Sequence, residues 1–163
     1  YRFARNYYNI FPSGSIDYTL NKKNTVSAAY SYRIDRPHYG MLNPVRMISD
    51  QLNYGAGNPE LRPQFTHEMS IYHNYNQFIT QTIGLNKTKD FTFWYSYIPP
   101  GTRMNVDTIS NIRASDNLFY SVSAQNRIKW YNFQTYAVVI YRRFSGELRN
   151  EDVSSSTVQF YMN

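Results

Sequence analysis

Hydrophobic and polar residues alternate along several stretches of this chain, most clearly over residues 24–35. One side of this stretch carries Val26, Ala28, Tyr30, Tyr32 and Ile34, and the other carries Ser27, Ala29, Ser31, Arg33 and Asp35. Because successive side chains of a β-strand point to opposite faces, the pattern predicts a strand with one apolar, aromatic face and one polar face. Its length matches the roughly 9–11 residues that a tilted strand needs to cross a lipid bilayer.

The same alternation returns along the chain and predicts about seven strands. They are expected at residues 15–20, 25–35, 64–74, 78–98, 102–126, 133–144 and 157–163. An interruption is expected near residues 87–90, and the apolar run 137–140 leaves its register open. The predicted fold is all-β, with antiparallel up-and-down strands and no helix longer than about two turns.

The connections between these strands differ in length. Short turns are predicted at 21–24, 75–77 and 127–131, a tight turn at 99–101, a polar loop at 145–155 and a much longer stretch at 36–63. That long stretch contains four prolines and three glycines, so we expect neither helix nor ladder strand within it. Loops of this length in a compact domain are usually functional or disordered, and the prolines and aromatic residues favour an ordered one.

An odd number of strands does not close a single-chain bacterial barrel, which has an even number. The pattern therefore predicts an arc of a larger transmembrane β-barrel, with residues 1–163 as a partial barrel domain. The chain begins at Tyr1 without a signal peptide, so we expect a processed form or a fragment. The residues predicted to face lipid are Ile16, Tyr18, Leu20, Val26, Ala28, Tyr30, Leu118, Tyr120 and Val122.

Composition leaves two classes of β-protein open. The chain has 17 Tyr, 10 Phe and 2 Trp, yet its mean hydropathy is only −0.61. Such a composition suits strands that are wet on one face and aromatic girdles at the two membrane interfaces. It also suits the alternative, a soluble β-sandwich binding module that stacks carbohydrate on tyrosines. Strand length favours the barrel, because strands in globular proteins are typically about 5–6 residues long.

Charge and chemistry exclude several functions. The net charge is +6, but Lys and Arg are scattered, so we expect no nucleic-acid partner. With no cysteine, disulfides and thiolate metal sites are excluded in these residues. No nucleophile elbow, P-loop or dinucleotide fingerprint is present, and His67 and His73 share a strand face without a visible third ligand. We expect no enzyme, no catalytic residue, no cofactor and no metal site, and we place the two histidines at membrane interfaces.

A set of motifs is nevertheless distinctive. They are Asn-Ile-Phe-Pro-Ser at 9–13, Arg-Pro at 36–37, Leu-Asn-Pro at 42–44, Gly-Asn-Pro-Glu-Leu-Arg-Pro at 57–63 and Ser-Asn-Ile-Arg-Ala-Ser-Asp-Asn at 110–117. In this order and spacing the chain resembles the C-terminal β-barrel of Bacteroidetes-type TonB-dependent outer-membrane receptors, within the outer membrane protein beta-barrel family. The resemblance extends over about residues 7–145.

The resemblance implies a receptor that imports a scarce ligand across the bacterial outer membrane. Its energy would come from a TonB complex acting through a plug domain that these residues lack. The remaining barrel strands are absent too, because the family's barrels resemble the roughly 22-stranded plugged transporters. The implied partners are the lipid bilayer, the TonB complex and an unknown small-molecule, peptide or glycan ligand.

In such a receptor, residues 36–63 would form a long extracellular loop opposite the turn at 21–24. The candidate residues for contact with ligand or plug are Arg36, Tyr39, Asn43, Arg46, Tyr54 and Asn58. The alternative is that the motif residues of the loop only shape it. Asn43 and Asn58 precede prolines and favour turns, and Gly57 permits a positive φ.

Overall fold

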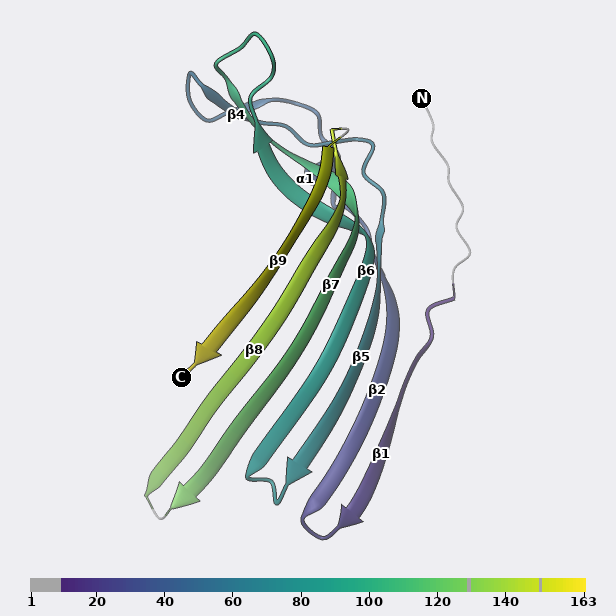
Figure 1. Ribbon diagram of the computed structural model, residues 1–163, viewed down its shortest axis with the longest axis vertical. Helices are drawn as coiled ribbons and strands as arrows, with labels where there is room; N and C mark the ends of the chain where they lie inside the picture. The colour runs from purple at the N-terminus through teal and green to yellow at the C-terminus, as the bar shows by residue number, and fades with distance from the viewer. Residues whose placement is uncertain (1–9, 129, 150) are drawn as a thin grey trace.

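Seven long strands form a single sheet in this computed structural model, which describes residues 10–128, 130–149 and 151–163 (Figure 1). They are β1 (Ser13–Asn21), β2 (Asn24–Asp35), β5 (Gln64–Tyr75), β6 (Ile79–Tyr97), β7 (Asn105–Ile128), β8 (Tyr131–Leu148) and β9 (Glu151–Met162). Each pairs antiparallel with the next long strand along the chain. The prediction of about seven up-and-down strands is confirmed. No helix in the described part of the chain is long and apolar enough to span a membrane.

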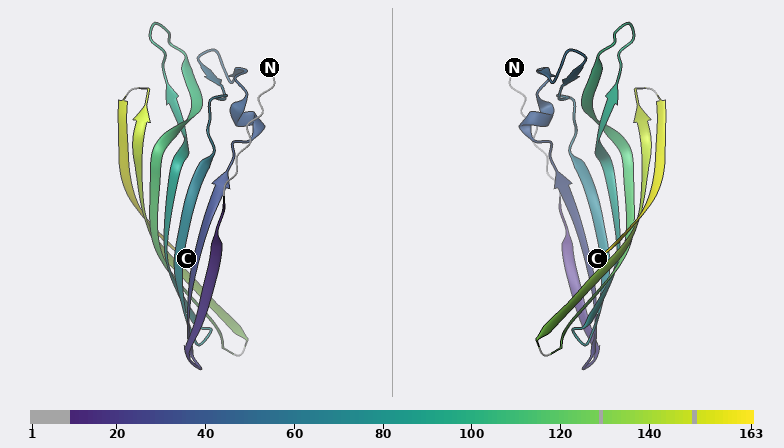
Figure 2. Two further views of the ribbon diagram at one scale, coloured as in Figure 1. Left: turned by 90° about the vertical axis from the view of Figure 1, so that its right-hand side faces the viewer. Right: turned by 90° about the vertical axis from the view of Figure 1, so that its left-hand side faces the viewer.

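The sheet is one open, twisted layer (Figure 2). Within the described residues, β1 and β9 each pair with only one neighbouring strand, so the sheet does not close. A β-sandwich needs a second sheet packed face to face against the first, and every described strand belongs to the same sheet. The strands β6, β7 and β8 contain 19, 24 and 18 residues. The fold is therefore the predicted arc of a barrel, and the sandwich alternative is wrong.

The predicted loop at residues 145–155 is also wrong. There β8 continues to Leu148 and β9 begins at Glu151, and these two residues pair with each other. The segment is polar because this end of the hairpin is solvated, and polarity by itself does not prevent a backbone ladder. Residues 129 and 150, which fall in the connections predicted at 127–131 and 145–155, lie outside the described residues, as do residues 1–9.

The stretch 36–63 contains more regular structure than expected. It forms the one-turn helix α1 (Tyr39–Leu42) and the short strands β3 (Met47–Ile48) and β4 (Asn53–Gly55). The prediction that it holds neither helix nor ladder strand is wrong, because its prolines lie between these elements rather than within them. The helix stays within the predicted limit of two turns.

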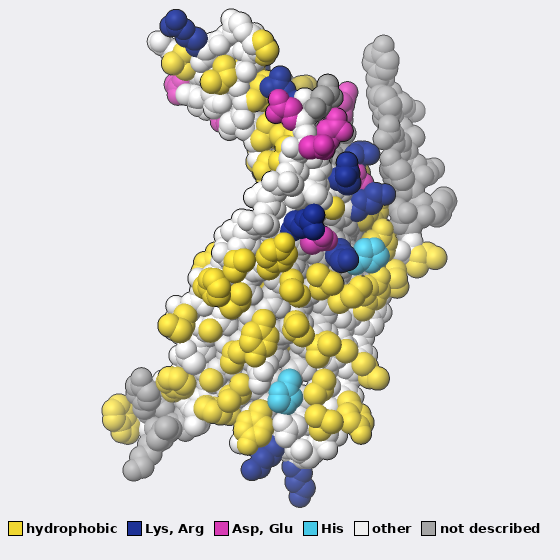
Figure 3. Space-filling model, in the orientation of Figure 1, with side chains coloured by type: hydrophobic (Ala, Val, Ile, Leu, Met, Phe, Trp, Pro, Cys, Tyr) yellow, Lys and Arg dark blue, Asp and Glu magenta, His cyan; other side chains and the backbone are white. Residues whose placement is uncertain are grey.

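One face of the sheet is apolar over most of its width. A row of directly opposed residues crosses all seven long strands: Ile16, Ala28, Ile71, Ile83, Tyr120, Val139 and Phe160. The next row comprises Tyr30, Met69, Leu85, Leu118, Tyr141 and Val158. Many of these side chains are exposed, including Ile16 at 70% and Phe160 at 73%. Figure 3 shows the resulting hydrophobic zone, and the paired residues predicted to face lipid all lie on this face.

The opposite face is mostly polar. Ser31 donates a hydrogen bond to the Glu68 carboxylate at 3.0 Å, and Arg33 forms an ion pair with the same carboxylate at 3.4 Å. The ambiguous run 137–140 is resolved by its register, because Val139 pairs with Tyr120 on the apolar face while the buried Val138 pairs with Ser121 on the polar one.

Gly84 is needed for packing on this polar face. A Cβ atom at Gly84 would lie 2.3 Å from the ring of Phe119, the residue that it opposes on β7. The ring therefore lies across the glycine backbone.

A charge on the apolar face should impair folding far more than a charge on the polar face. Ala28→Arg places a guanidinium between Ile16 and Ile71, and in hydrocarbon it should destabilise the barrel by about 2–4 kcal/mol. Ser27→Arg lies on the other face, opposite Asp17, and should cost much less. Folding of the full-length barrel into lipid vesicles, followed by heat-dependent gel mobility, compares the two. Equal folding yields would contradict the assignment of faces.

Candidate functional site

The candidate site is built around an edge of β7. Strand β8 pairs with β7 only as far as Ala114 and Ser145, whereas β7 extends in the same direction to Asn105. Beyond that point β4 pairs in parallel with β7, with Tyr54 opposite Val106. Residues 36–63, which connect β2 to β5, thus reach past the β6–β7 hairpin to the far edge of β7 (Figure 1).

Hydrogen bonds continue this attachment beyond the short strand. The Ala56 N–H donates to the Asp107 carbonyl at 3.0 Å, and the Thr108 hydroxyl donates to the Ala56 carbonyl at 2.9 Å. The Asn58 side-chain amide donates to the Ile109 carbonyl at 3.1 Å. The segment thereby supplies hydrogen-bond partners to backbone groups on the edge of β7 that β8 does not cover. Backbone groups that are excluded from water need such partners.

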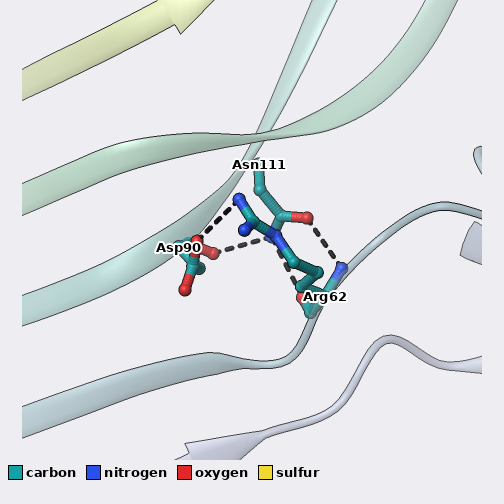
Figure 4. Close-up of polar contacts among 3 residues, drawn as sticks. All are labelled: Arg62, Asp90 and Asn111. Carbon is teal, nitrogen blue, oxygen red and sulfur yellow. Dashed lines mark hydrogen bonds and ion pairs between the residues drawn. The ribbon is translucent and has the colours of Figure 1, made fainter.

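The attachment ends in a three-residue clasp formed by Arg62, Asp90 and Asn111 (Figure 4). The Asn111 carboxamide accepts the Arg62 N–H at 2.7 Å and donates to the Arg62 and Asp90 carbonyls at 3.0 and 2.7 Å. The Arg62 guanidinium forms an ion pair with the Asp90 carboxylate at 2.8 Å. Asp90 has a φ of 54°, a left-handed conformation that Asp tolerates better than most residues. The predicted interruption near 87–90 corresponds to this residue.

Of the five buried apolar side chains in the described residues, four lie on the outer part of β7 and on the attached segment, and the fifth is Val138 of β8. Val106, Ile109 and Ile112 of β7 are 3%, 0% and 2% exposed, and Leu61 of the segment is 9% exposed. Fully burying a side chain of this size contributes about 1.5–3 kcal/mol. Buried apolar side chains thus accompany the hydrogen bonds that attach residues 36–63 to β7.

Gly57 brings two parts of the segment into close contact. A Cβ atom there would lie 2.5 Å from the Met41 carbonyl oxygen and 2.6 Å from that of Asn43, and the Gly57 N–H donates to the latter at 2.9 Å. Gly57 does not use the positive φ that a glycine permits, since Gly101 is the only described glycine with one. The glycine is required by the close approach of backbones.

Two of the candidate residues serve as scaffold for the segment. The Asn43 side-chain oxygen accepts the Val45 N–H at 3.1 Å, and that of Asn58 accepts the Glu60 N–H at 2.9 Å. The Asn58 N–H also donates to the Met41 carbonyl at 2.7 Å. Both asparagines therefore hold turns in the way that asparagine before proline favours.

The other four candidates occupy separate positions on the segment. The Arg46 guanidinium lies 4.9 Å from the ring centroid of Tyr54, within the range of a cation–π contact. Tyr39 begins α1 and is 85% exposed. Arg36 lines a shallow cavity of about 240 Å³ together with Gln64 and Trp94. The structure thus brings Arg46 and Tyr54 together, and it places Tyr39 and Arg36 elsewhere on the same end of the sheet.

Some residues of the site were not found from the sequence. The tip around β3 exposes Val45, Met47, Ile48 and Leu52, by 53–76%. The tip is closed by Asp50, whose carboxylate accepts the Leu52 N–H at 2.7 Å and the Asn53 amide. The Leu52 N–H and the Asn53 side chain hold the pKa of Asp50 below its usual value. The Asp-x-x-Asn pattern could have indicated this turn, whereas nothing local indicated that Arg62 and Asn111 meet.

The histidines lie at opposite ends of the apolar rows. His67 stacks on Tyr32 with ring centroids 4.4 Å apart and bonds the Tyr30 hydroxyl at 2.9 Å, while His73 bonds Asn24 beside the short turn at 3.0 Å. Within the described ranges, no three residues among His, Asp and Glu are grouped so that they could hold a metal ion.

Comparisons with known proteins agree with this architecture. A model of the outer membrane protein beta-barrel family matches residues 1–163. Among solved structures, the siderophore receptor PirA from Pseudomonas aeruginosa has a similar fold, with a TM-score of 0.61 and 16% sequence identity. The alignment covers 94% of this chain and 34% of that receptor, so the chain spans about a third of the receptor's length. No curated protein matches the chain in sequence.

The clasp predicts a local loss of stability when it is broken. Asn111→Leu removes three hydrogen bonds and should raise the hydrogen-exchange rate of the Ala56 and Leu61 amides, by an amount equivalent to about 1–3 kcal/mol. Asn105→Leu on the same strand is the matched control, because its amide bonds only Asp107, at 3.3 Å. Unchanged exchange in Asn111→Leu would show that the segment is held without the clasp.

Proposed function

Because the chain belongs to the outer membrane protein beta-barrel family, we propose that it forms part of the barrel of a TonB-dependent receptor. The family's localisation in the bacterial outer membrane supports the proposal that the apolar face contacts lipid. The proposed role is uptake of a scarce ligand through the barrel, without covalent chemistry. The motifs at 36–37, 42–44 and 57–63 support a receptor of the Bacteroidetes type.

The observation that carries the proposal is the asymmetry between the two ends of the sheet. One end has short turns, such as the one between Asn21 and Asn24. The other end holds residues 36–63, the segment attached to β7, which is called the clamped segment from here on. In outer-membrane barrels long loops face outward and short turns face the periplasm. The clamped segment is therefore proposed to face the outside of the cell.

A loop held in one conformation suits ligand binding, because little conformational entropy is lost when the ligand arrives. Asn43 and Asn58 supply the scaffold, and Arg36, Tyr39, Arg46 and Tyr54 are proposed to contact the ligand. Guanidinium groups and phenol rings together bind planar or anionic groups well. Such groups occur in small molecules, peptides and glycans alike.

The polar face is proposed to line the barrel lumen, where it would meet the plug domain through which a TonB complex acts. A depression of about 340 Å³ on this face is lined by Ser15, Ser31, Arg33 and Glu68, among others. The Arg33–Glu68 pair leaves carboxylate and guanidinium groups available for polar contacts with a plug.

Energised uptake tests the function. Cells that produce the full-length receptor should accumulate radioactive iron from a panel of ferric siderophores, a probe chosen from the structural neighbour. Accumulation should be lost in cells that lack TonB. Arg46→Ala with Tyr54→Ala should raise the half-saturating concentration about tenfold, equivalent to about 1.4 kcal/mol, whereas Lys23→Ala should not. Uptake that is independent of TonB would indicate a passive pore instead.

Cysteine labelling of intact cells tests the orientation. A membrane-impermeant maleimide should label Ser49→Cys in the clamped segment and spare Lys23→Cys in the short turn. Both positions are exposed, and these 163 residues contain no native cysteine. Both variants should react in broken membranes, which controls for reactivity. Labelling of the turn alone in intact cells would reverse the proposed orientation.

A further inference from the structure

The apolar rows end in a charged row on the side of residues 36–63. This row crosses the sheet through Tyr32, His67, Lys87, Asp116, Arg143 and Ser156. It lies two residues along each strand from the row that contains Leu85 and Leu118, which is about 7 Å at the usual rise of a strand. Figure 3 shows basic and acidic side chains directly above the hydrophobic zone.

Aromatic side chains mark the same level as a membrane boundary. Tyr32 stacks on His67 and on Phe65, with ring centroids 4.4 and 6.0 Å apart, and lies 5.7 Å from the ring of Phe11. Tyrosines and tryptophans gather at headgroup level in membrane proteins. The charged row therefore lies where lipid headgroups, rather than acyl chains, contact the barrel.

A charged depression adjoins the row on the side away from the apolar zone. It has a volume of about 410 Å³ and is lined by Arg62, Lys89, Asp90, Asn111, Arg113, Glu147 and Arg149. Asp90 is neutralised by Arg62 at 2.8 Å, and the Arg149 guanidinium lies 3.9 Å from the centroid of the Tyr97 ring. Lys89 and Arg113 are exposed and remain available to an incoming anion.

The row and the depression together carry positive charge. They contain six basic residues (Arg62, Lys87, Lys89, Arg113, Arg143, Arg149) and three acidic ones (Asp90, Asp116, Glu147), a net charge of +3. In the described part of the chain, no carboxylate lies within 4.0 Å of the charged nitrogens of Lys87, Lys89, Arg113 or Arg143. Asp116 lies between Lys87 and Arg143 in the register, so the positive charge is least compensated at Lys89 and Arg113.

We propose that this surface binds the phosphate-bearing headgroup of a membrane lipid whose acyl chains lie on the adjoining apolar rows. Lys and Arg place their charge at the interface while their stems follow apolar surface, and guanidinium groups bind phosphate with two hydrogen bonds. A lipid fits better than a soluble anion, because the charged row continues directly from the apolar face. This proposal depends on the apolar face lying in lipid, and it is independent of the receptor's ligand and of TonB.

Lipid titration monitored by native mass spectrometry tests the proposal. The full-length barrel in neutral detergent is titrated with diphosphoryl lipid A and, separately, with the dephosphorylated lipid. Lys89→Gln/Arg113→Gln should weaken binding of the phosphorylated lipid by about tenfold or more, given the contribution expected of each basic residue near a membrane surface. The matched control Lys22→Gln/Lys23→Gln removes the same charge from the short turn and should bind as the parent protein does.

Three results would overturn the proposal: equal weakening in both double variants, equal binding of the dephosphorylated lipid, or complete displacement by inorganic phosphate at the concentration of the lipid. The last result would indicate a site for soluble anions. Heat-dependent gel mobility shows whether each variant is folded. If Lys89→Gln/Arg113→Gln does not fold, the single variant Lys89→Gln takes its place. Lys89→Arg keeps the positive charge and should bind the phosphorylated lipid as the parent protein does.

Discussion

The structure depends on how the free edge of β7 is satisfied. This strand continues to Asn105 after β8 has left it at Ala114, so residues 105–113 would otherwise present an unpaired ladder edge. Exposed edges recruit other strands, and natural proteins cover them. Here the covering segment comes from the connection between β2 and β5, and Ile109 in this part of β7 is completely buried. The extension of β7 beyond β8 and the ordered conformation of residues 36–63 therefore depend on each other.

The distribution of apolar residues follows from the same geometry. A soluble domain buries its large side chains inside, but every large side chain in the row from Ile16 to Phe160 is exposed. This surface is stable in water only when lipid or detergent covers it. Four of the five buried apolar side chains in the described residues lie on the outer part of β7 and on the clamped segment, and Val138 of β8 is the exception. Consequently the apolar rows are stabilised by lipid or detergent, whereas the junction of β7 with the clamped segment is stabilised by contacts within the protein.

Local patterns predicted the strands, but not the contacts between distant segments. Alternation in residues 24–35 gave β2 within one residue, because a face in contact with lipid must be apolar at every second position. It failed at residues 145–155, since polar residues also form ladders in water. The parallel pairing of Tyr54 with Val106 and the contact of Arg62 with Asn111 join residues about 50 positions apart, and no local signal encodes such a distance. Of the candidate residues, the turn chemistry of Asn43 and Asn58 could be predicted, whereas the approach of Arg46 to Tyr54 could not.

The close approach at Gly57 has a consequence for how such a protein can change. Because the Gly57 N–H bonds the Asn43 carbonyl, the chain between them leaves and returns at almost the same point, as in an Ω-loop. The tip at residues 44–51 lies outside the anchors that bind β7, and loop-closure entropy rises only slowly with length. Insertions and substitutions at this tip therefore leave the barrel's register intact. The tip is thus a module whose sequence can change while the strands that carry it keep their pairing.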